Sequence, residues 1–273
     1  MHKKLKTLLS IAGSDPMGGA GIQADIRAGQ AMGFHVVTAV TSVTVQNSKG
    51  IYDILPIDSS LLQAQLHRIL EDCQPDAIKV GMMGSVNNFI EVGNFLLNLP
   101  IKSPVVVDPV LSVTADGGHL FCGTSPSEIA QLYLYNIFPW TSVATPNIHE
   151  LKVLLNKKRL NLASFTTILK ELSLNHLIVK GGDAKGKIIT DKLLSYTGVC
   201  SHSHPKINCK NLHGTGCVYS SLLACNLALG FSLEEAFMIT NKKMEEIINS
   251  SCDYSLGNSN YGPLNLIKYD HFD

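Results

Sequence analysis

A short glycine-rich run, His213-Gly214-Thr215-Gly216-Cys217, stands directly before an apolar segment, residues 218–229, that has helical spacing. Glycine allows a tight backbone turn, and the first N–H groups of a helix have no acceptor within the helix. Together with the positive end of the helix dipole, those groups can surround an anion. The run therefore predicts a phosphate-binding loop at Gly214, Thr215 and Gly216. A glycine-rich helix start that binds nothing is the alternative.

Cys217 falls in the first turn of that predicted helix. The pKa of a cysteine tends to fall in such a position, and a thiolate there can accept a proton. Cysteine is also a common small apolar residue of protein cores. Its place beside the predicted anion site favours a catalytic role.

Polar residues follow one apolar run after another along the chain. Ligands of open parallel sheets bind at the carboxyl ends of the strands, so these residues are candidates for one shared site. Turn formation alone also enriches Gly, Asn and Asp at such places. The set comprises Gly13-Ser14-Asp15, Gln46-Asn47, Lys79, Asp108, Asn147 with Glu150, and Lys180-Gly181-Gly182.

The stretch from Gly13 to Asp25 is too rich in glycine to be helical throughout, which predicts a close approach of its backbone to another group. It contains neither a Walker A motif nor a Gly-x-Gly-x-x-Gly fingerprint. A P-loop enzyme and a dinucleotide-dependent dehydrogenase are therefore disfavoured. Asp25 is either a substrate ligand or a carboxylate that stabilises a helix N-terminus.

The elements that must position these residues alternate between short apolar runs and segments of helical periodicity, which predicts βαβ units. Unbroken apolar strands are typical of a parallel sheet covered on both faces. Strands are expected at residues 7–12, 36–45, 77–80, 105–107, 142–145 and 177–180, and helices at 23–32, 61–70, 88–97, 127–137 and 148–155. A hairpin over residues 187–197 and helices over 216–229 and 233–249 follow. Gly230 fits a C′ glycine, and Ser232 with Glu235 fits a capping box.

Length and composition favour one domain over residues 1–273, because 45% of the residues are hydrophobic and no linker interrupts the pattern. Lys plus Arg equals Asp plus Glu at 22 each, so no net charge attracts a nucleic acid or an anionic membrane. The seven cysteines form no CxxC pair, and no apolar stretch reaches the length of a membrane span. We expect a cytoplasmic protein that acts on small molecules.

Taken in order, these motifs resemble the hydroxymethylpyrimidine/phosphomethylpyrimidine kinases of thiamine biosynthesis, within the ribokinase-like superfamily. The likeness extends along nearly the whole chain. It includes Ile11-Ala12-Gly13-Ser14-Asp15, residues 18–25, Thr38-Ala39-Val40-Thr41, Gln46-Asn47, Lys79-Val80-Gly81-Met82, residues 106–110, Thr145-Pro146-Asn147 with Glu150, Lys180-Gly181-Gly182, residues 213–217 and Gly262-Pro263-Leu264-Asn265. The resemblance implies a ribokinase-like three-layer α/β/α sandwich with a central mostly parallel sheet, and a homodimer.

The resemblance also implies two successive ATP-dependent phosphorylations of 4-amino-5-hydroxymethyl-2-methylpyrimidine, first to the monophosphate and then to the pyrophosphate. Gln46 would recognise the amino edge of the ring and Asp25 its hydroxymethyl group, with Gly13 and Met82 nearby. The amides of Gly214, Thr215 and Gly216 would hold the transferring phosphoryl group. Most ribokinase-like enzymes have an aspartate where this chain has Cys217, and the pyrimidine kinases resemble it in using cysteine.

At the ATP end, the resemblance implies contacts from Asp108, Asn147, Lys180, Gly181 and Thr215, and Mg²⁺ held by Asp108 and Glu150. Magnesium prefers such oxygen ligands. The alternatives are capping roles: Asp108 would cap a strand end before Pro109, and Asn147 with Glu150 would cap a helix.

Two stretches depart from the usual family pattern, residues 111–118 and Asn260-Tyr261, which leaves the second phosphorylation less secured than the first. A pyridoxal or pyridoxine kinase is the nearest alternative, because its substrate is also a hydroxymethyl heteroaromatic. A non-catalytic sensor of thiamine precursors is the alternative from another class.

Overall fold

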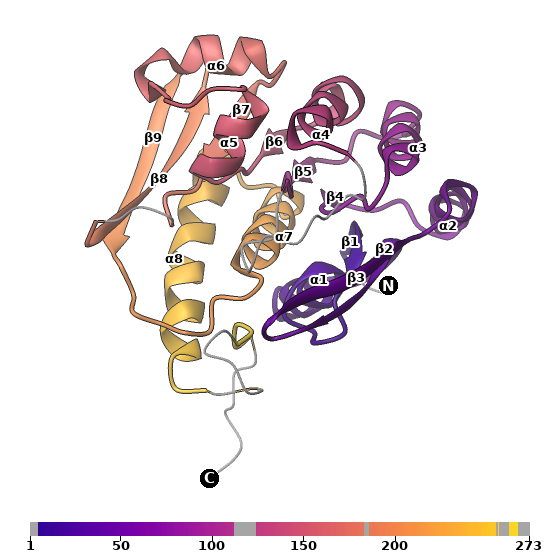
Figure 1. Ribbon diagram of the computed structural model, residues 1–273, viewed down its shortest axis with the longest axis horizontal. Helices are drawn as coiled ribbons and strands as arrows, with labels where there is room; N and C mark the ends of the chain where they lie inside the picture. The colour runs from indigo at the N-terminus through magenta and orange to yellow at the C-terminus, as the bar shows by residue number, and fades with distance from the viewer. Residues whose placement is uncertain (1–4, 112–123, 183–185, 255, 257–261, 267–273) are drawn as a thin grey trace.

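The computed structural model describes residues 5–111, 124–182, 186–254, 256 and 262–266. A nine-stranded sheet, in the order β3-β2-β1-β4-β5-β6-β7-β8-β9, runs through the middle of this part of the chain (Figure 1). Its strands are β1 (Thr7–Ser14), β2 (His35–Asn47), β3 (Gly50–Pro56), β4 (Ala77–Val80), β5 (Val105–Val107), β6 (Val143–Ala144), β7 (His176–Val179), β8 (Ile188–Ser195) and β9 (Gly198–Pro205). The departures 111–118 and 260–261 fall mostly or wholly outside the described residues.

The centre of the sheet is parallel and its margins are antiparallel. Strands β2, β1, β4, β5, β6 and β7 pair in parallel, whereas β3 pairs antiparallel with β2, and β8 and β9 form an antiparallel extension of β7. The carboxyl ends of the parallel strands therefore meet along one edge, which is where such sheets place ligands.

Helices cover both faces of the sheet, as Figure 1 shows. They are α1 (Gly21–Ala31), α2 (Ser59–Asp72), α3 (Val86–Leu97), α4 (Pro126–Leu132), α5 (Ile148–Leu154), α6 (Phe165–Glu171), α7 (Thr215–Ala228) and α8 (Leu233–Ser251). Neighbouring strand residues point to opposite faces, so Leu8 packs in the core beneath α1, α7 and α8 while Leu9 packs in the core beneath α2 to α6. The predicted three-layer sandwich with a mostly parallel sheet is confirmed. None of the described helices is long and apolar enough to cross a bilayer.

The six predicted strands all form, but the antiparallel margins differ from the sequence prediction. The hairpin expected over residues 187–197 is longer, because β8 turns at Tyr196 and Thr197 into β9, which continues to Pro205. The sequence of β9 alternates between exposed and half-buried residues and has no apolar run. Strand β3 has no fully buried residue, and helix α6 is only 7 residues long with Ile168 and Leu169 buried, so neither was predicted.

The predicted helix ends are confirmed at α7 and α8. Gly230 follows α7 with a φ of 93°, a backbone conformation that favours glycine, and Ser232 forms a capping box with Glu235 at the start of α8. The helix expected over residues 127–137 changes character midway, since α4 ends at Leu132 and continues as a π-helical turn, Tyr133–Ile137.

Candidate active site

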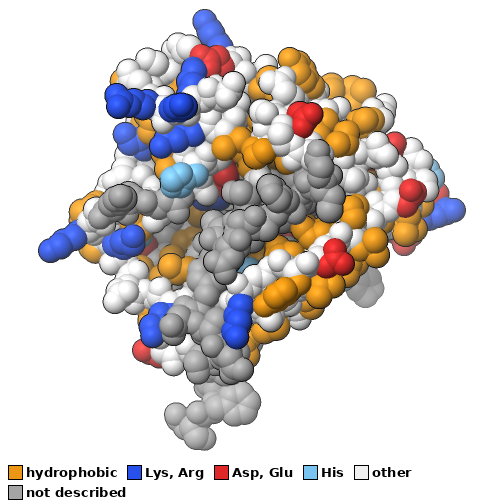
Figure 2. Space-filling view, in the orientation of Figure 1, with side chains coloured by type: hydrophobic (Ala, Val, Ile, Leu, Met, Phe, Trp, Pro, Cys, Tyr) orange, Lys and Arg blue, Asp and Glu red, His pale blue; other side chains and the backbone are white. Residues whose placement is uncertain are grey.

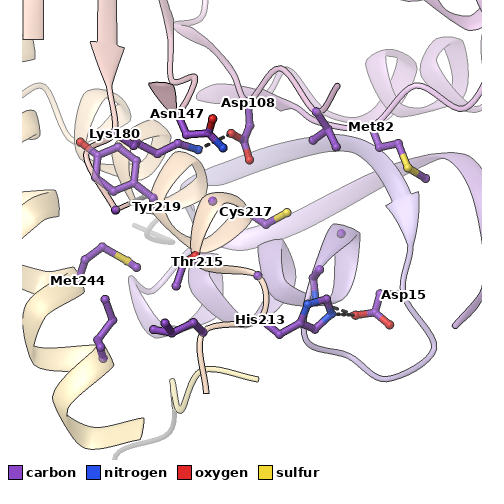
Figure 3. Close-up of a pocket in the computed structure, with 18 of the residues that line it drawn as sticks. Asp15, Met82, Asp108, Asn147, Lys180, His213, Thr215, Cys217, Tyr219 and Met244 are labelled. Atoms are coloured by element: carbon purple, nitrogen blue, oxygen red, sulfur yellow. Dashed lines mark hydrogen bonds and ion pairs between the residues drawn. The ribbon is translucent and has the colours of Figure 1, made fainter. Parts of the chain in front are cut away.

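A cavity of about 900 Å³ opens at the carboxyl ends of the parallel strands. It brings together most of the predicted site residues, which arrive from segments far apart in the sequence (Figure 3). Those that line it are Gly13, Gln46, Met82, Asp108, Asn147, Glu150, Lys180, Gly214, Thr215, Gly216 and Cys217. The strand-end residues are therefore parts of one site.

The glycine-rich loop at the start of α7 is built for close backbone contact. Gly214 has a φ of 81°, and a Cβ atom there would collide with the carbonyl oxygen of Gly19. On the other side, a Cβ atom on Gly216 would lie 3.0 Å from Asp108 Oδ2 and 3.1 Å from Lys180 Nζ. Glycine at 214 lets the two loops meet, and glycine at 216 leaves room for the ion pair beside the start of α7. The first N–H groups of a helix have no acceptor within the helix.

Asp15 organises the loop between β1 and α1. Its carboxylate accepts hydrogen bonds from the amides of Met17 (2.8 Å), Gly19 (3.0 Å) and Ala20 (2.8 Å), and it pairs with His213 Nε2 at 3.0 Å. Burial acts to raise the pKa of Asp15, but the hydrogen bonds from His213, Met17 and Ala20 hold it below its ordinary value. Asp15 thus ties the N-terminal glycine loop to the phosphate loop.

Asp15→Asn is expected to lower the free energy of unfolding by about 2 kcal/mol at pH 7, because hydrogen bonds to a charged carboxylate are lost. A group with a lowered folded-state pKa stabilises above its unfolded pKa and loses that contribution as the pH falls through the folded value. The gap between variant and parent in urea unfolding should therefore close between neutral and strongly acidic pH. Asp72→Asn, an exposed aspartate at the end of α2, is the control. An unchanged gap at acidic pH would contradict this role.

Asp108 and Lys180, which were both predicted to contact ATP, form an ion pair. Lys180 Nζ donates to Asp108 Oδ1 at 2.8 Å, and both side chains are largely buried. Burial acts to lower the pKa of Lys180, but the charges of Asp108 and Glu150 raise it above its ordinary value. Lys180 is therefore a permanent cation at the cavity wall beside Gly216.

Asn147 and Glu150 cap helix α5. Asn147 Oδ1 accepts from the amide of Glu150 at 2.8 Å, and Glu150 Oε2 accepts from the amide of Asn147 at 2.7 Å. The capping alternative is thus confirmed, and it does not remove either residue from the cavity lining. Among the described residues no three His, Cys, Asp or Glu side chains form a metal cluster.

Cys217 lies between the Asp108–Lys180 pair and the Asp15–His213 pair in Figure 3. Burial raises the pKa of its thiol to about 11, opposed by the charge of Lys79 and an amide hydrogen bond from Gly21, while Asp25 and Asp108 raise it further. The lowered pKa expected at a helix start is therefore wrong for this structure. Desolvation and the charges of Asp25 and Asp108 together outweigh the charge of Lys79 and the hydrogen bond from Gly21.

Two predicted ligands do not reach the cavity. Asp25 is 0% exposed and accepts hydrogen bonds from Ser10 Oγ, Ser221 Oγ and Lys79 Nζ, so its carboxylate is enclosed by protein behind the cavity wall. Gly181 packs against the backbone of Thr190 in β8 and donates its amide to Asp191 at 2.6 Å. In this structure protein groups therefore bind both residues, and the contacts of Asp25 with substrate and of Gly181 with ATP stay predictions.

Gly13, Thr44, Gln46 and Met82 line the cavity at the carboxyl ends of β1, β2 and β4. Gly13 faces Met82, because a Cβ atom on Gly13 would lie 2.5 Å from Met82 Cε. Thr44 and Gln46 are two residues apart in β2 and both line the cavity, and Thr44 Oγ1 donates to the carbonyl of Ser14 at 2.9 Å. This part of the lining therefore combines the apolar side chain of Met82 with the polar side chains of Thr44 and Gln46.

Several lining residues had no predicted role. Tyr219, Asn241 and Met244 line the cavity from α7 and α8, and Figure 3 shows Tyr219 beside Lys180 and Met244 beyond it. Asn241 is buried and donates to Tyr219 Oη at 3.3 Å and to the carbonyl of Phe237. In the sequence, the signal that could have indicated this part of the cavity is Asn241, a polar residue on the apolar face of a long amphipathic helix. Lys79, within the predicted strand, also lines the cavity.

Kinases of thiamine biosynthesis match this chain along most of its length. The phosphomethylpyrimidine kinase family model matches residues 15–265. The hydroxymethylpyrimidine/phosphomethylpyrimidine kinase of Bacillus subtilis is 32% identical, with 96% of this chain and 94% of that protein covered. The chain spans about half (51%) of another relative, the thiamine biosynthetic bifunctional enzyme of Arabidopsis thaliana, at 31% identity.

Solved structures agree with this likeness. The phosphomethylpyrimidine kinase of Clostridium difficile superimposes with a TM-score of 0.74 at 28% identity, covering 88% of this chain and 98% of that one. An ADP complex of Bacillus subtilis pyridoxal kinase gives a TM-score of 0.79 at 26% identity, covering 96% and 97%. The ribokinase-like fold and the kinase activity predicted from the sequence are confirmed. With its motifs gathered around one cavity, the chain belongs to the phosphomethylpyrimidine kinase family.

Proposed function

We propose that this chain transfers the γ-phosphoryl group of ATP to the hydroxymethyl group of 4-amino-5-hydroxymethyl-2-methylpyrimidine, and then a second phosphoryl group to the monophosphate. The observation that carries the proposal is the arrangement within one cavity. Cys217 lies between Met82 and Lys180 in Figure 3, and Gly216 of the glycine-rich loop packs directly against the Asp108–Lys180 pair at the charged end of the cavity. An acceptor hydroxyl and a nucleotide phosphate can therefore meet at the loop.

The residues at the transfer point supply alignment and charge. Phosphoryl transfer has little covalent chemistry for a protein to perform, so positioning and neutralisation of phosphate charge dominate. The amides of Thr215 and Gly216 would face the transferring group, and Lys180 would neutralise phosphate oxygens. Cys217 would face the acceptor hydroxyl.

The charged end also fits Mg²⁺. Magnesium keeps several waters and is typically held by one or two carboxylates plus substrate phosphates, so it needs no cluster of three protein ligands. Asp108 and Glu150 are close enough that both charges act on Lys180, and Lys180 binds Oδ1 of Asp108, which leaves Oδ2 as the second carboxylate oxygen beside Gly216. The two carboxylates would hold the ion, which would supply neutralisation of the phosphate oxygens of ATP.

Gln46 is proposed to select the pyrimidine. A primary amide both donates and accepts hydrogen bonds, which suits a ring nitrogen next to an exocyclic amine. Gln46→Leu should lower kcat/KM for the pyrimidine by about 10-fold to 100-fold, because one or two buried hydrogen bonds are lost, and change that for pyridoxine less. Gln131→Leu, an exposed position on α4, is the matched control.

The deciding assay incubates the protein with Mg-ATP and either the pyrimidine or pyridoxine, and follows products by mass spectrometry. Monophosphate followed by pyrophosphate is the expected result. Phosphorylation of pyridoxine alone would favour the second candidate, a pyridoxal or pyridoxine kinase, for which the likeness to pyridoxal kinase structures is the supporting observation. If ATP were not turned over with either compound, the result would favour a non-catalytic binding protein.

A cytoplasmic homodimer is also proposed, by analogy with the family. A band of hydrophobic side chains runs along the β2–β3 ribbon on the face shown in Figure 2. It includes the exposed Val43, Val45, Tyr52 and Leu55. Covering such a strip is a common reason for self-association. Sedimentation as a monomer at micromolar concentration would exclude the dimer.

A further inference from the structure

Lys79 is a buried cation at the wall of the cavity with unused hydrogen-bonding capacity. It lies in β4, its side chain is 0% exposed, and its Nζ donates to Asp25 Oδ2 at 2.9 Å. Within the described residues, this carboxylate is the one hydrogen-bond acceptor recorded for an ammonium group that has three N–H donors. A buried ammonium in this situation calls for a further polar or anionic partner.

Asp25 fixes the position of that ammonium. Ser10 Oγ donates to Asp25 Oδ2 at 2.5 Å, and Ser221 Oγ donates to Asp25 Oδ1 at 2.9 Å. These contacts come from β1 and α7, so the carboxylate is held from both sides. Lys79 Nζ also packs against Gly81, where a Cβ atom would lie 2.8 Å away. The ammonium therefore has little freedom to leave its place.

This anchored pair places the ammonium next to the helical turn that carries Cys217, because Ser221 lies one turn after Cys217 on the same face of α7 and donates to the carboxylate that binds Lys79. Lys79 and Cys217 both line the cavity. The charged and polar groups that act on the thiol of Cys217 are Lys79 from β4, Asp25 from α1, Asp108 after β5, Lys180 after β7 and the amide of Gly21. The charge of Lys79 lowers the pKa of Cys217, whereas the charges of Asp25 and Asp108 raise it. Lys79 and Asp25, which are hydrogen-bonded to each other, thus shift the pKa of the thiol in opposite directions.

We propose that Lys79 is a positioning residue for phosphoryl transfer, whose Asp25-anchored ammonium stabilises the thiolate form of Cys217. The proposal rests on the function proposed above. The thiolate accepts the proton of the acceptor hydroxyl as its oxygen forms a bond to the γ-phosphorus and the bond from that phosphorus to the leaving ADP oxygen breaks. Asp25 then serves the reaction through Lys79 and has no contact with substrate of its own.

The test is the pH dependence of alkylation of Cys217 by iodoacetamide, without substrate, followed by peptide-resolved mass spectrometry. Asp25→Asn should move the midpoint to lower pH, because a negative charge is removed. Adding Lys79→Met to that variant should move it back up by about one unit, which is about a tenfold slower reaction at a fixed pH below the midpoint. The double variant leaves no unpaired buried charge, so it is the variant suited to folding.

Matched measurements separate this role from a structural one. Cys73, at the C-terminal cap of α2 and outside the cavity lining, should react at the same rate in every variant. Lys79→Arg, which keeps the charge, should keep the parent midpoint more closely than Lys79→Met. The proposal would be overturned if Asp25→Asn and the double variant had equal midpoints. It would also be overturned if adding Lys79→Met lowered the midpoint further. Alkylation is measured without substrate, so its result does not depend on which compound is phosphorylated. If the product assay showed phosphorylation of pyridoxine alone, the substrate assignment would fail while the role of Lys79 could still hold.

Discussion

Cys217→Ala should reduce kcat for the pyrimidine by about a hundredfold or more while KM stays within a factor of a few, because general base catalysis contributes about 10²-fold to 10⁴-fold. The thiol lines the cavity, and in the proposed mechanism it faces the acceptor hydroxyl without holding either substrate. Cys225→Ala is the matched control. It removes the same atom from the same helix, but Cys225 is fully buried in the core beneath α7.

The pH dependence of kcat provides a second test of the role of Cys217. Since the thiol pKa is raised to about 11, the thiolate is a minor species at neutral pH and grows about tenfold for each unit of pH below that value. The parent's kcat should therefore rise from pH 7 to pH 9, and the rise should be absent in Cys217→Ala. A variant that kept most of the parent's turnover and its pH profile would show that Cys217 does not act as the base.

The sequence was most informative where one residue type is required by a local need. Gly214 and Gly216 are recognisable because a turn, a helix start and an anion site all demand glycine, and the structure places them where predicted. Parallel strands such as β4 and β5 are equally clear, because residues buried on both faces form unbroken apolar runs.

Burial and charge at the site could not be read from the sequence. Asp25 was predicted to contact substrate, yet its surroundings depend on Ser10 and Ser221, which come from distant segments and enclose it. The same holds for Cys217, whose local position at a helix start predicts a lower pKa while the assembled site raises it. Local rules give the sign of one effect, and tertiary structure decides which of several effects is larger.

Gly214→Ala should abolish most of the activity, because the change acts on the backbone of the phosphate loop itself. The residue has a φ of 81°, and its Cβ atom would collide with the carbonyl of Gly19. Relief of that collision must move the N-terminal glycine loop or the start of α7, and either shift carries the amides away from the transferring group. Loss of one such donor lowers kcat by about 10²-fold to 10³-fold in comparable sites.

Gly33→Ala separates this effect from backbone strain. Gly33 has a similar φ of 78°, lies just after α1, and has nothing within 4 Å of its Cβ position. Both variants should lose about 1 kcal/mol or more of unfolding free energy from the left-handed backbone. Only Gly214→Ala should also lose turnover and ADP affinity, measured by steady-state kinetics and calorimetry. If the two variants lost similar stability and both kept their turnover, the loop would be a helix start and nothing more, and the charged pair Asp108–Lys180 would have to carry the phosphates alone.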